Sequence, residues 1–134
     1  ESGQPFCRQK LLGFTLANLA KSGCGRIVYS YITRDMFEKS GALREHTEGI
    51  IDQIRIVQDT LVAALIIEEN DRAYKMSFRT CGSIPANEIA GILGGGGHPR
   101  ASGAALSGTL DEVTARMISA VTTVLDSKKE DGRG

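Results

Sequence analysis

Apolar residues follow two different spacings along the chain, and each spacing predicts a different element. Stretches rich in β-branched and aromatic residues predict strands at residues 26–33, 61–69, 73–80 and 103–107. Apolar residues repeated every three to four positions predict helices at residues 5–21, 34–40, 46–57, 86–93 and 110–126. Together these elements predict a single α/β domain, with a mixed β-sheet of about four to five strands flanked by helices.

Residues that favour helix ends support these boundaries. Thr33 is a predicted N-cap, and Gly41 is predicted to end the short helix that follows. Thr109 and Glu112 have the spacing of a capping box, which predicts that the last helix starts near residue 110. We expect Thr47 to cap the helix over residues 46–57.

The predicted strand over residues 73–80 alternates between apolar and polar side chains. Tyr74, Met76 and Phe78 are expected to face the core, and the polar side chains are Lys75, Ser77 and Arg79. A polar stripe of this kind is often only the solvated face of a hairpin. It is also a candidate binding surface, because Arg79 lies where the strand ends.

Charge and composition narrow the function classes. The 134 residues carry 16 basic and 16 acidic side chains, so the net charge is zero. This balance argues against a strongly basic protein that binds duplexes through its overall charge, but it allows a local phosphate site. No apolar run is long enough to span a membrane, and no signal peptide is visible. Cys7, Cys24 and Cys81 are widely spaced, which favours reduced cytosolic thiols over a zinc site.

The stretch GGGGHPRASGAAL, residues 94–106, is the most unusual part of the chain. Four glycines between two apolar elements predict that another group closely approaches the backbone, and free N–H groups can bind an anion. If this loop lies beside the end of the preceding strand, Arg79 and Arg100 could share that anion. His98 is either an ordinary surface or core histidine or a donor to a phosphate. We favour binding over general-base catalysis, because no metal or nucleophile cluster accompanies it. Gly94 is a predicted helix C-cap.

These stretches resemble one protein family. GGGGHPRASGAAL resembles the G-G-G-G-H-x-x-A-[AS]-G signature of the DHH-associated domain, a C-terminal module of DHH-family phosphoesterases. LLGFTLANL, GRIVYSYIT, HTEGIIDQIRIV and KMSFRT resemble, in the same order, segments of its oligoribonuclease/pAp-phosphatase branch. The resemblance covers residues 8–126.

The resemblance implies a domain organisation and a chemistry. Residues 1–25 would form a linker helix from an upstream catalytic DHH domain, residues 26–126 the substrate-binding domain, and residues 127–134 a disordered tail. The DHH domain of such proteins holds two Mn²⁺ ions that activate water. This chain would supply no catalytic residue and no metal ligand, so we expect it to be inactive alone while its parent acts as a phosphoesterase.

The resemblance also implies substrate contacts and partners. The substrate-binding residues would be Ser77, Arg79, Gly95, Gly96, Gly97, His98 and Arg100. The expected ligands are short single-stranded RNA or nucleotide phosphates such as pAp, bound in a cytoplasmic protein without a membrane partner. A homodimer is left open. A non-catalytic module that binds tRNA or a cyclic dinucleotide is the alternative.

Overall fold

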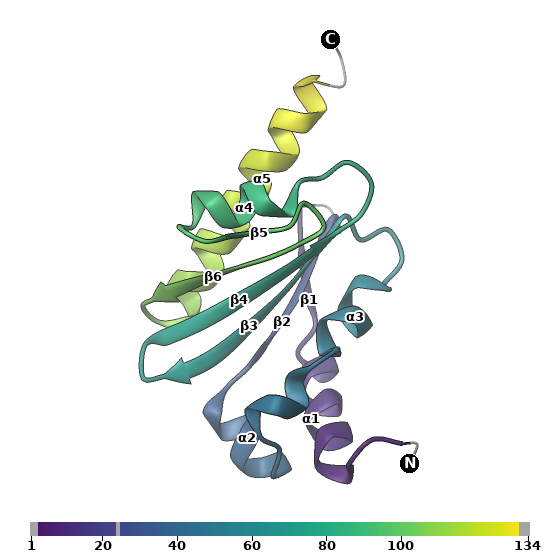
Figure 1. Cartoon of the computed structure of the whole chain (residues 1–134), viewed down its shortest axis with the longest axis vertical. Helices are drawn as coiled ribbons and strands as arrows, with labels where there is room; N and C mark the ends of the chain where they lie inside the picture. The colour runs from purple at the N-terminus through teal and green to yellow at the C-terminus, as the bar shows by residue number, and fades with distance from the viewer. Residues whose placement is uncertain (1–2, 24, 132–134) are drawn as a thin grey trace.

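Six strands form one mixed sheet with helices on both of its faces (Figure 1). The computed structural model describes residues 3–23 and 25–131. The strands are β1 (Ala20–Ser22), β2 (Ile27–Ile32), β3 (Val62–Asn70), β4 (Ala73–Thr80), β5 (Gly96–Gly97) and β6 (Ala101–Ser107), in the spatial order β1-β2-β3-β4-β6-β5. The α-helices are α1 (Phe6–Ala17), α2 (Arg34–Ser40), α3 (Ile50–Arg55), α4 (Ala86–Ile92) and α5 (Leu110–Asp131), and η1 (Arg44–Thr47) is a 3₁₀-helix.

The predicted fold class is confirmed, with slightly more strands than expected. The first extra strand is β1, which lies inside the predicted helix over residues 5–21. That helix ends at Ala17, and Ala20–Ser22 pairs antiparallel with β2. The second extra strand is β5, which pairs antiparallel with β6 inside the glycine stretch. Both are short edge strands held by a neighbouring strand, so local propensity did not reveal them.

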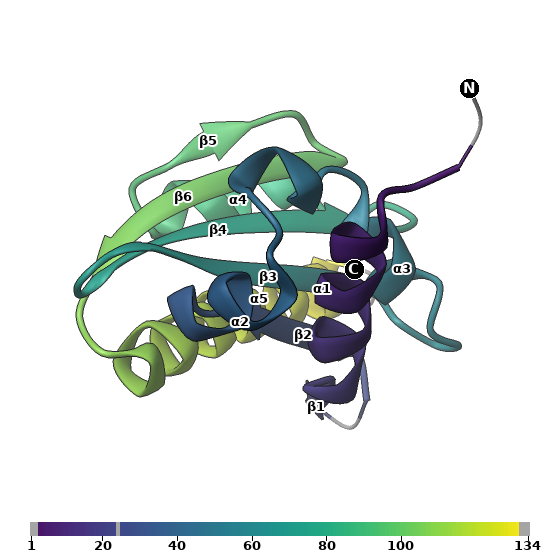
Figure 2. The same ribbon diagram turned by 90° about the horizontal axis from the view of Figure 1, so that it is seen from below.

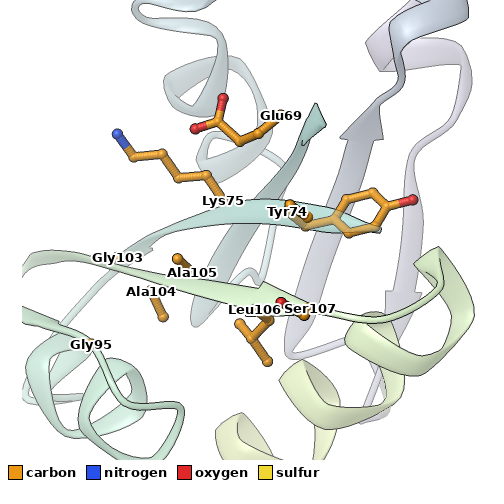
Figure 3. Close-up of a pocket in the computed structure, with 10 residues that line it drawn as sticks. Glu69, Tyr74, Lys75, Gly95, Gly103, Ala104, Ala105, Leu106 and Ser107 are labelled. Carbon is orange, nitrogen blue, oxygen red and sulfur yellow. The ribbon is translucent and has the colours of Figure 1, made fainter. Parts of the chain in front are cut away.

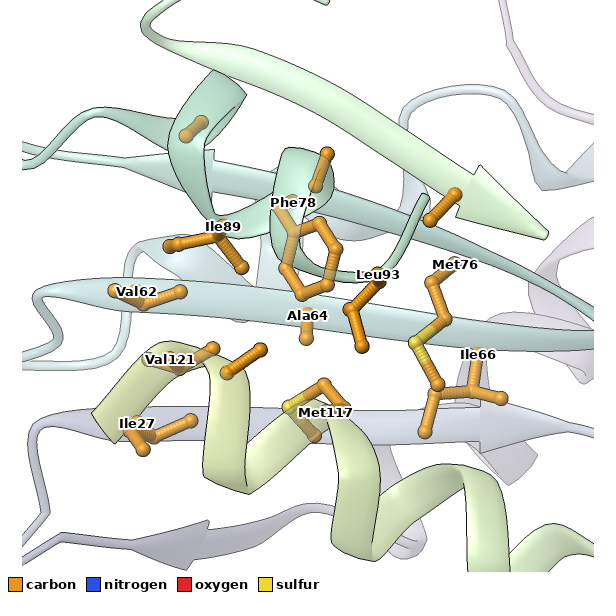
Figure 4. Packing of buried hydrophobic residues seen from close by; sticks show 14 of the residues in the cluster. Ile27, Val62, Ala64, Ile66, Met76, Phe78, Ile89, Leu93, Met117 and Val121 are labelled. Carbon is orange, nitrogen blue, oxygen red and sulfur yellow. The ribbon is translucent and has the colours of Figure 1, made fainter. Parts of the chain in front are cut away.

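The two central strands are buried on both faces, and each face belongs to a separate apolar cluster. β2 and β3 pair in parallel, and residues 62–67 of β3 are all buried. Ile27, Ala64 and Ile66 pack with Met117 of α5 and with α4 on one face (Figure 4). Ile32 and Leu65 belong to the cluster formed with α1, α2 and α3 on the other face. This double burial explains the continuous apolar run in β3.

The layer formed by α1, α2 and α3 covers only part of its face of the sheet. Helices α1, α2 and α3 lie over β2, β3 and the near side of β4, whereas α4 and α5 cover the opposite face (Figures 1 and 2). The rest of β4, together with β6 and β5, therefore presents backbone and small or polar side chains on the α1–α3 face. We call this region of β4, β6 and β5 the open face.

The termini of α2 follow the sequence signals, whereas the segment over residues 46–57 departs from them. Thr33 accepts a hydrogen bond from Met36 N at 3.3 Å, and Gly41 ends α2 in the left-handed conformation, as predicted. The helix expected over residues 46–57 is instead split into η1 and α3, and Thr47 Oγ1 donates to the Arg44 carbonyl at 2.8 Å rather than capping α3. Gly49, with φ +82°, occupies the N-cap position.

Helix α5 begins as predicted and continues past its predicted end. Thr109 and Glu112 form the reciprocal capping box, with N···O distances of 2.8 and 3.1 Å. The helix reaches Asp131, beyond the expected end near residue 126. The remainder of the predicted tail, residues 132–134, lies outside the described residues. None of the described helices is long and apolar enough to cross a membrane. Cys7 and Cys81 are free, and Cys24 lies outside the described residues.

The capping box predicts an acid-dependent contribution to stability. The backbone hydrogen bond from Thr109, helped by the Thr109 hydroxyl, lowers the pKa of Glu112. A carboxyl whose pKa is lower in the folded state stabilises the fold above its unfolded-state pKa, and this contribution disappears as the pH falls through the folded-state pKa. We therefore expect Glu112→Gln to flatten the acid limb of the free energy of unfolding. Urea unfolding across the acid range, with Asp111→Asn as an exposed control, measures this; parallel curves for Glu112→Gln and wild type would contradict it.

Candidate nucleotide-binding face

The polar stripe of β4 lies on the open face, as its alternation predicts. Tyr74, Met76 and Phe78 are buried against α4 and α5, which confirms their predicted core positions. Lys75 is exposed on the other side of the strand. Ser77 and Arg79 are half-buried there, beside the η1–α3 segment. The half-buried position limits the motion of both side chains, so they can hold a ligand in a defined orientation.

A strip of very small residues runs beside this stripe. In the antiparallel pairing of β4 with β6, Arg79 is opposite Ala101, Ser77 opposite Gly103, and Lys75 opposite Ala105. Directly opposed residues in a sheet point to the same face. β5 extends the surface by one strand, because Gly96 pairs with Gly103. A flat group can therefore lie against the backbone of β6 and β5 while β4 supplies charge and hydrogen bonds.

Two adjacent grooves follow this surface and meet at Lys75. The smaller, of about 160 Å³, runs between the β4 stripe and the η1–α3 segment; its lining includes Arg44, Thr47, Glu48, Gly49, Lys75, Ser77 and Arg79. The larger, of about 570 Å³, is open and crosses β4 and β6 (Figure 3); its lining includes Glu69, Lys75, Gly95, Gly103, Ala105 and Ser107.

The glycine stretch forms a tight hairpin against β6, and β6 lies too close to two of its glycines for either to carry a side chain. A Cβ on Gly95 would lie 2.1 Å from the Gly103 carbonyl oxygen and 2.7 Å from Ala104 Cα. A Cβ on Gly97, which has φ +141°, would lie 2.8 Å from Ser102 Cα. At Gly96, by contrast, a Cβ would meet nothing within 4 Å. Among these three glycines, only Gly96 has no steric reason within the chain to be glycine.

The turn after β5 holds the His98 ring against its own backbone. His98 N donates to the Ala101 carbonyl at 2.9 Å, and Ala101 N donates back to the His98 carbonyl at 3.2 Å. The His98 Nδ1 accepts from Arg100 N at 3.1 Å. In the neutral ring the proton therefore sits on Nε2, and this N–H is available as a donor because the residue is exposed.

Backbone hydrogen bonds place this turn beside the end of β4. Pro99 O accepts from Ala86 N at 2.8 Å and from Thr80 Oγ1 at 3.2 Å, and Arg100 O accepts from Thr80 N at 3.2 Å. The glycine loop therefore lies beside the end of β4, as a shared anion site would require. The sharing itself by Arg79 and Arg100 stays a prediction. The Arg79 Nη1 donates to the Phe78 carbonyl at 3.0 Å, which fixes one edge of the guanidinium.

Several residues that line the grooves were not among the substrate-binding residues predicted from the sequence. Arg44 pairs with Glu69 across the rim of the grooves. Glu48 lines the smaller groove, and its carbonyl accepts from the Arg8 guanidinium at 3.2 Å. Lys75 belonged to the predicted stripe but not to the predicted site. The family-like stretch HTEGII was the available signal for the η1–α3 segment, whereas nothing in the sequence pointed to Glu69.

The described residues do not fit a manganese site. Within residues 3–23 and 25–128, no three His, Cys, Asp or Glu side chains come together as metal ligands. The charged groups of the open face are instead mainly lysine and arginine, which bind anions. The arrangement is therefore suited to binding and orienting a phosphate-bearing ligand.

A comparison with models of protein families identifies the family of this chain. Residues 25–126 match the model of the DHHA1 domain. The chain belongs to the DHHA1 domain family. The matched range includes β4, the glycine hairpin, β6 and the η1–α3 segment, so the whole open face lies inside the family domain.

Similar proteins narrow the relationship within this family. The chain is 33% identical over 113 residues to the bifunctional oligoribonuclease and PAP phosphatase NrnA of Thermus thermophilus, covering 84% of this chain and 33% of that protein. It is 30% identical over 102 residues to the probable bifunctional oligoribonuclease and PAP phosphatase NrnA of Streptococcus mutans, covering 75% of this chain and 32% of that protein. The chain thus spans about a third of the length of these relatives. The predicted resemblance to the oligoribonuclease/pAp-phosphatase branch is confirmed.

A solved structure shows the same fold. An exopolyphosphatase-related protein from Bacteroides fragilis superposes with a TM-score of 0.83 at 23% identity, covering 90% of this chain and 36% of that one. The arrangement of the sheet between two helical layers is thus shared with a protein of low sequence identity.

Proposed function

We propose that this chain is the substrate-binding module of a DHH-family phosphoesterase that acts on short oligoribonucleotides or on nucleotide 3′-phosphates such as pAp. The observation that carries the proposal is the pairing of Lys75, Ser77 and Arg79 in register with the small residues of β6. The relatives that carry the names oligoribonuclease and PAP phosphatase support the same substrate class.

Each part of the open face has a role in this proposal. The Arg79 guanidinium, with one edge fixed on the Phe78 carbonyl, presents its remaining N–H groups to a phosphate. The Ser77 hydroxyl donates to a second oxygen. Gly103 and Gly96 leave room for a ribose or base to lie on the backbone, and the exposed Nε2–H of His98 contributes a further donor from the turn.

Hydrolysis itself is assigned to a different part of a longer protein. We propose that an upstream DHH domain holds Mn²⁺, which activates water, because this chain's own described side chains do not form a metal site. The chain's residues would bind the nucleotide end of the substrate and orient it toward that domain. We further propose a cytoplasmic location for the parent protein.

Nuclear magnetic resonance titration of the chain with pAp and with a short oligoadenylate tests the proposal. We expect amide shifts concentrated at Ser77, Arg79, Gly96, His98 and Gly103, together with the absence of turnover when Mn²⁺ is added. The proposed role would be contradicted by shifts confined to α4 and α5, or by no shifts at millimolar ligand. Stronger binding of a cyclic dinucleotide or tRNA would favour the non-catalytic alternative, and hydrolysis by the chain itself would contradict the division of labour.

A further inference from the structure

We infer that Glu69, held by Arg44, limits the length of the oligonucleotide that the open face accepts. This inference rests on the proposed function. Arg79, Ser77 and Lys75 provide donors along β4, and Glu69 lies at the far end of the same surface, where the larger groove begins. Its carboxylate is the negative group that a strand extending beyond Lys75 would approach.

The spacing of the stripe suits a short run of phosphates. Alternate residues of a strand are separated by about 6–7 Å, so Arg79 and Lys75 lie about 13 Å apart along β4. The spacing of about 6–7 Å between alternate residues is comparable with the separation of successive phosphates in an extended nucleotide chain. Arg79, Ser77 and Lys75 therefore suit three successive phosphates, so a 5′-phosphorylated dinucleotide, which has two, fits on the stripe without reaching beyond Lys75.

The alternation of β3 places Glu69 on this surface, because Ile67, two positions earlier, is opposite Lys75. Glu68 pairs with Tyr74 and Asn70 pairs with Ala73, so Glu69 has no partner in the register. The Glu69 and Lys75 side chains lie on the same side of β4, whereas Leu106 points away from it (Figure 3). Glu69 thus places a carboxylate next to the last cation of the stripe.

The ion pair with Arg44 removes the cation that a longer strand would need. The Arg44 and Glu69 side chains are 43% and 36% exposed, so both remain accessible to a ligand. While Glu69 is ionised, it neutralises Arg44 and repels a phosphate placed beyond Lys75. A neutral side chain at position 69 would free Arg44 to bind that phosphate instead. Glu69 is therefore a specificity-determining residue for strand length.

Binding of 5′-phosphorylated oligoadenylates of two and five nucleotides to the chain and to Glu69→Gln tests the inference. We expect the variant to bind the pentamer roughly two- to fivefold more tightly, with dinucleotide affinity unchanged, as for one exposed charge pair. The salt dependence should also change. For the pentamer alone, the slope of log affinity against log salt should become more negative by about 0.7, the value for one additional single-strand phosphate.

Two further variants distinguish a specific effect of the Arg44–Glu69 pair from the general loss of one negative charge. Glu68→Gln changes the neighbouring carboxylate, which accepts from Arg34 N instead, and should leave the pentamer-to-dinucleotide ratio unchanged. Combining Arg44→Gln with Glu69→Gln should give a smaller gain than Glu69→Gln alone, because the freed cation is then absent and only the repulsion by Glu69 has been removed. An unchanged ratio in Glu69→Gln, or an equal gain for both ligands, would overturn the length inference while leaving the proposed function standing. Failure of wild type to bind either ligand would overturn both.

Discussion

Replacing Gly95 by alanine is expected to destabilise the protein by about 2–3 kcal/mol, whereas the same change at Gly96 should leave the free energy of unfolding almost unchanged. The difference comes from the β5–β6 hairpin. The new Cβ at Gly95 would overlap the Gly103 carbonyl oxygen, at 2.1 Å, and relief would require the backbone of β6 to move. Overpacking that displaces backbone has an effect of this size. At Gly96 the added methyl group meets open space.

Chemical unfolding of Gly95→Ala and Gly96→Ala, together with their affinity for pAp, measures both effects in one pair of proteins. Gly96 is opposite Gly103 on the open face, so we expect Gly96→Ala to weaken binding without loss of stability. Gly97→Ala should resemble Gly95→Ala, because its Cβ would also meet β6 and its φ is +141°. Equal unfolding free energies for Gly95→Ala and Gly96→Ala would show that the hairpin adjusts more easily than its packing suggests.

This contrast changes the interpretation of the glycine stretch. From the sequence, four adjacent glycines predicted a backbone that a ligand approaches closely. The structure shows that β6 approaches Gly95 and Gly97, that Gly94 adopts a positive φ of +86° at the end of α4, and that Gly96 is unobstructed within β5. A bare backbone is equally required by a ligand or by a neighbouring strand, so composition alone could not separate the two reasons.

The parts of the fold that the sequence predicted correctly depend on local physics. The Thr33 cap and the Thr109–Glu112 capping box involve residues three positions apart, and alternation in β4 directly assigns Phe78 to the core. β1 and β5 were missed because three-residue and two-residue strands carry almost no pattern. They form because β2 and β6 offer unpaired edges, which is a property of the assembled sheet.

The candidate site was predictable to the extent that it lies on one patterned strand. Ser77 and Arg79 were identified from the alternation in β4 and from the resemblance of KMSFRT to the family. Arg44 and Glu69 come from segments separated by 25 positions in the sequence, and no periodicity links them. Glu69 also meets Lys75 only through the register of β3 with β4, which places Ile67, two positions before Glu69, opposite Lys75.

Replacing Arg79 by alanine is expected to reduce the affinity for pAp by about 1.5–3 kcal/mol, a loss of roughly 10- to 150-fold. Arg79 is half-buried at the end of β4, and its Nη1 donates to the Phe78 carbonyl. The guanidinium is therefore oriented before the ligand arrives, and less conformational entropy is lost on binding. Its remaining N–H groups can form charge-assisted hydrogen bonds to a phosphate.

Calorimetric titration of Arg79→Ala and Arg79→Lys, beside thermal unfolding of both, tests this role. Lysine keeps the charge and the aliphatic stem but lacks the planar pair of donors, so its affinity should lie between those of wild type and Arg79→Ala. Arg116→Ala, an exposed arginine on α5, is the matched control and should bind pAp as wild type does. If Arg79→Ala instead lowers the melting temperature strongly and binds pAp normally, Arg79 stabilises the end of β4, and the phosphate must contact other cations of the open face.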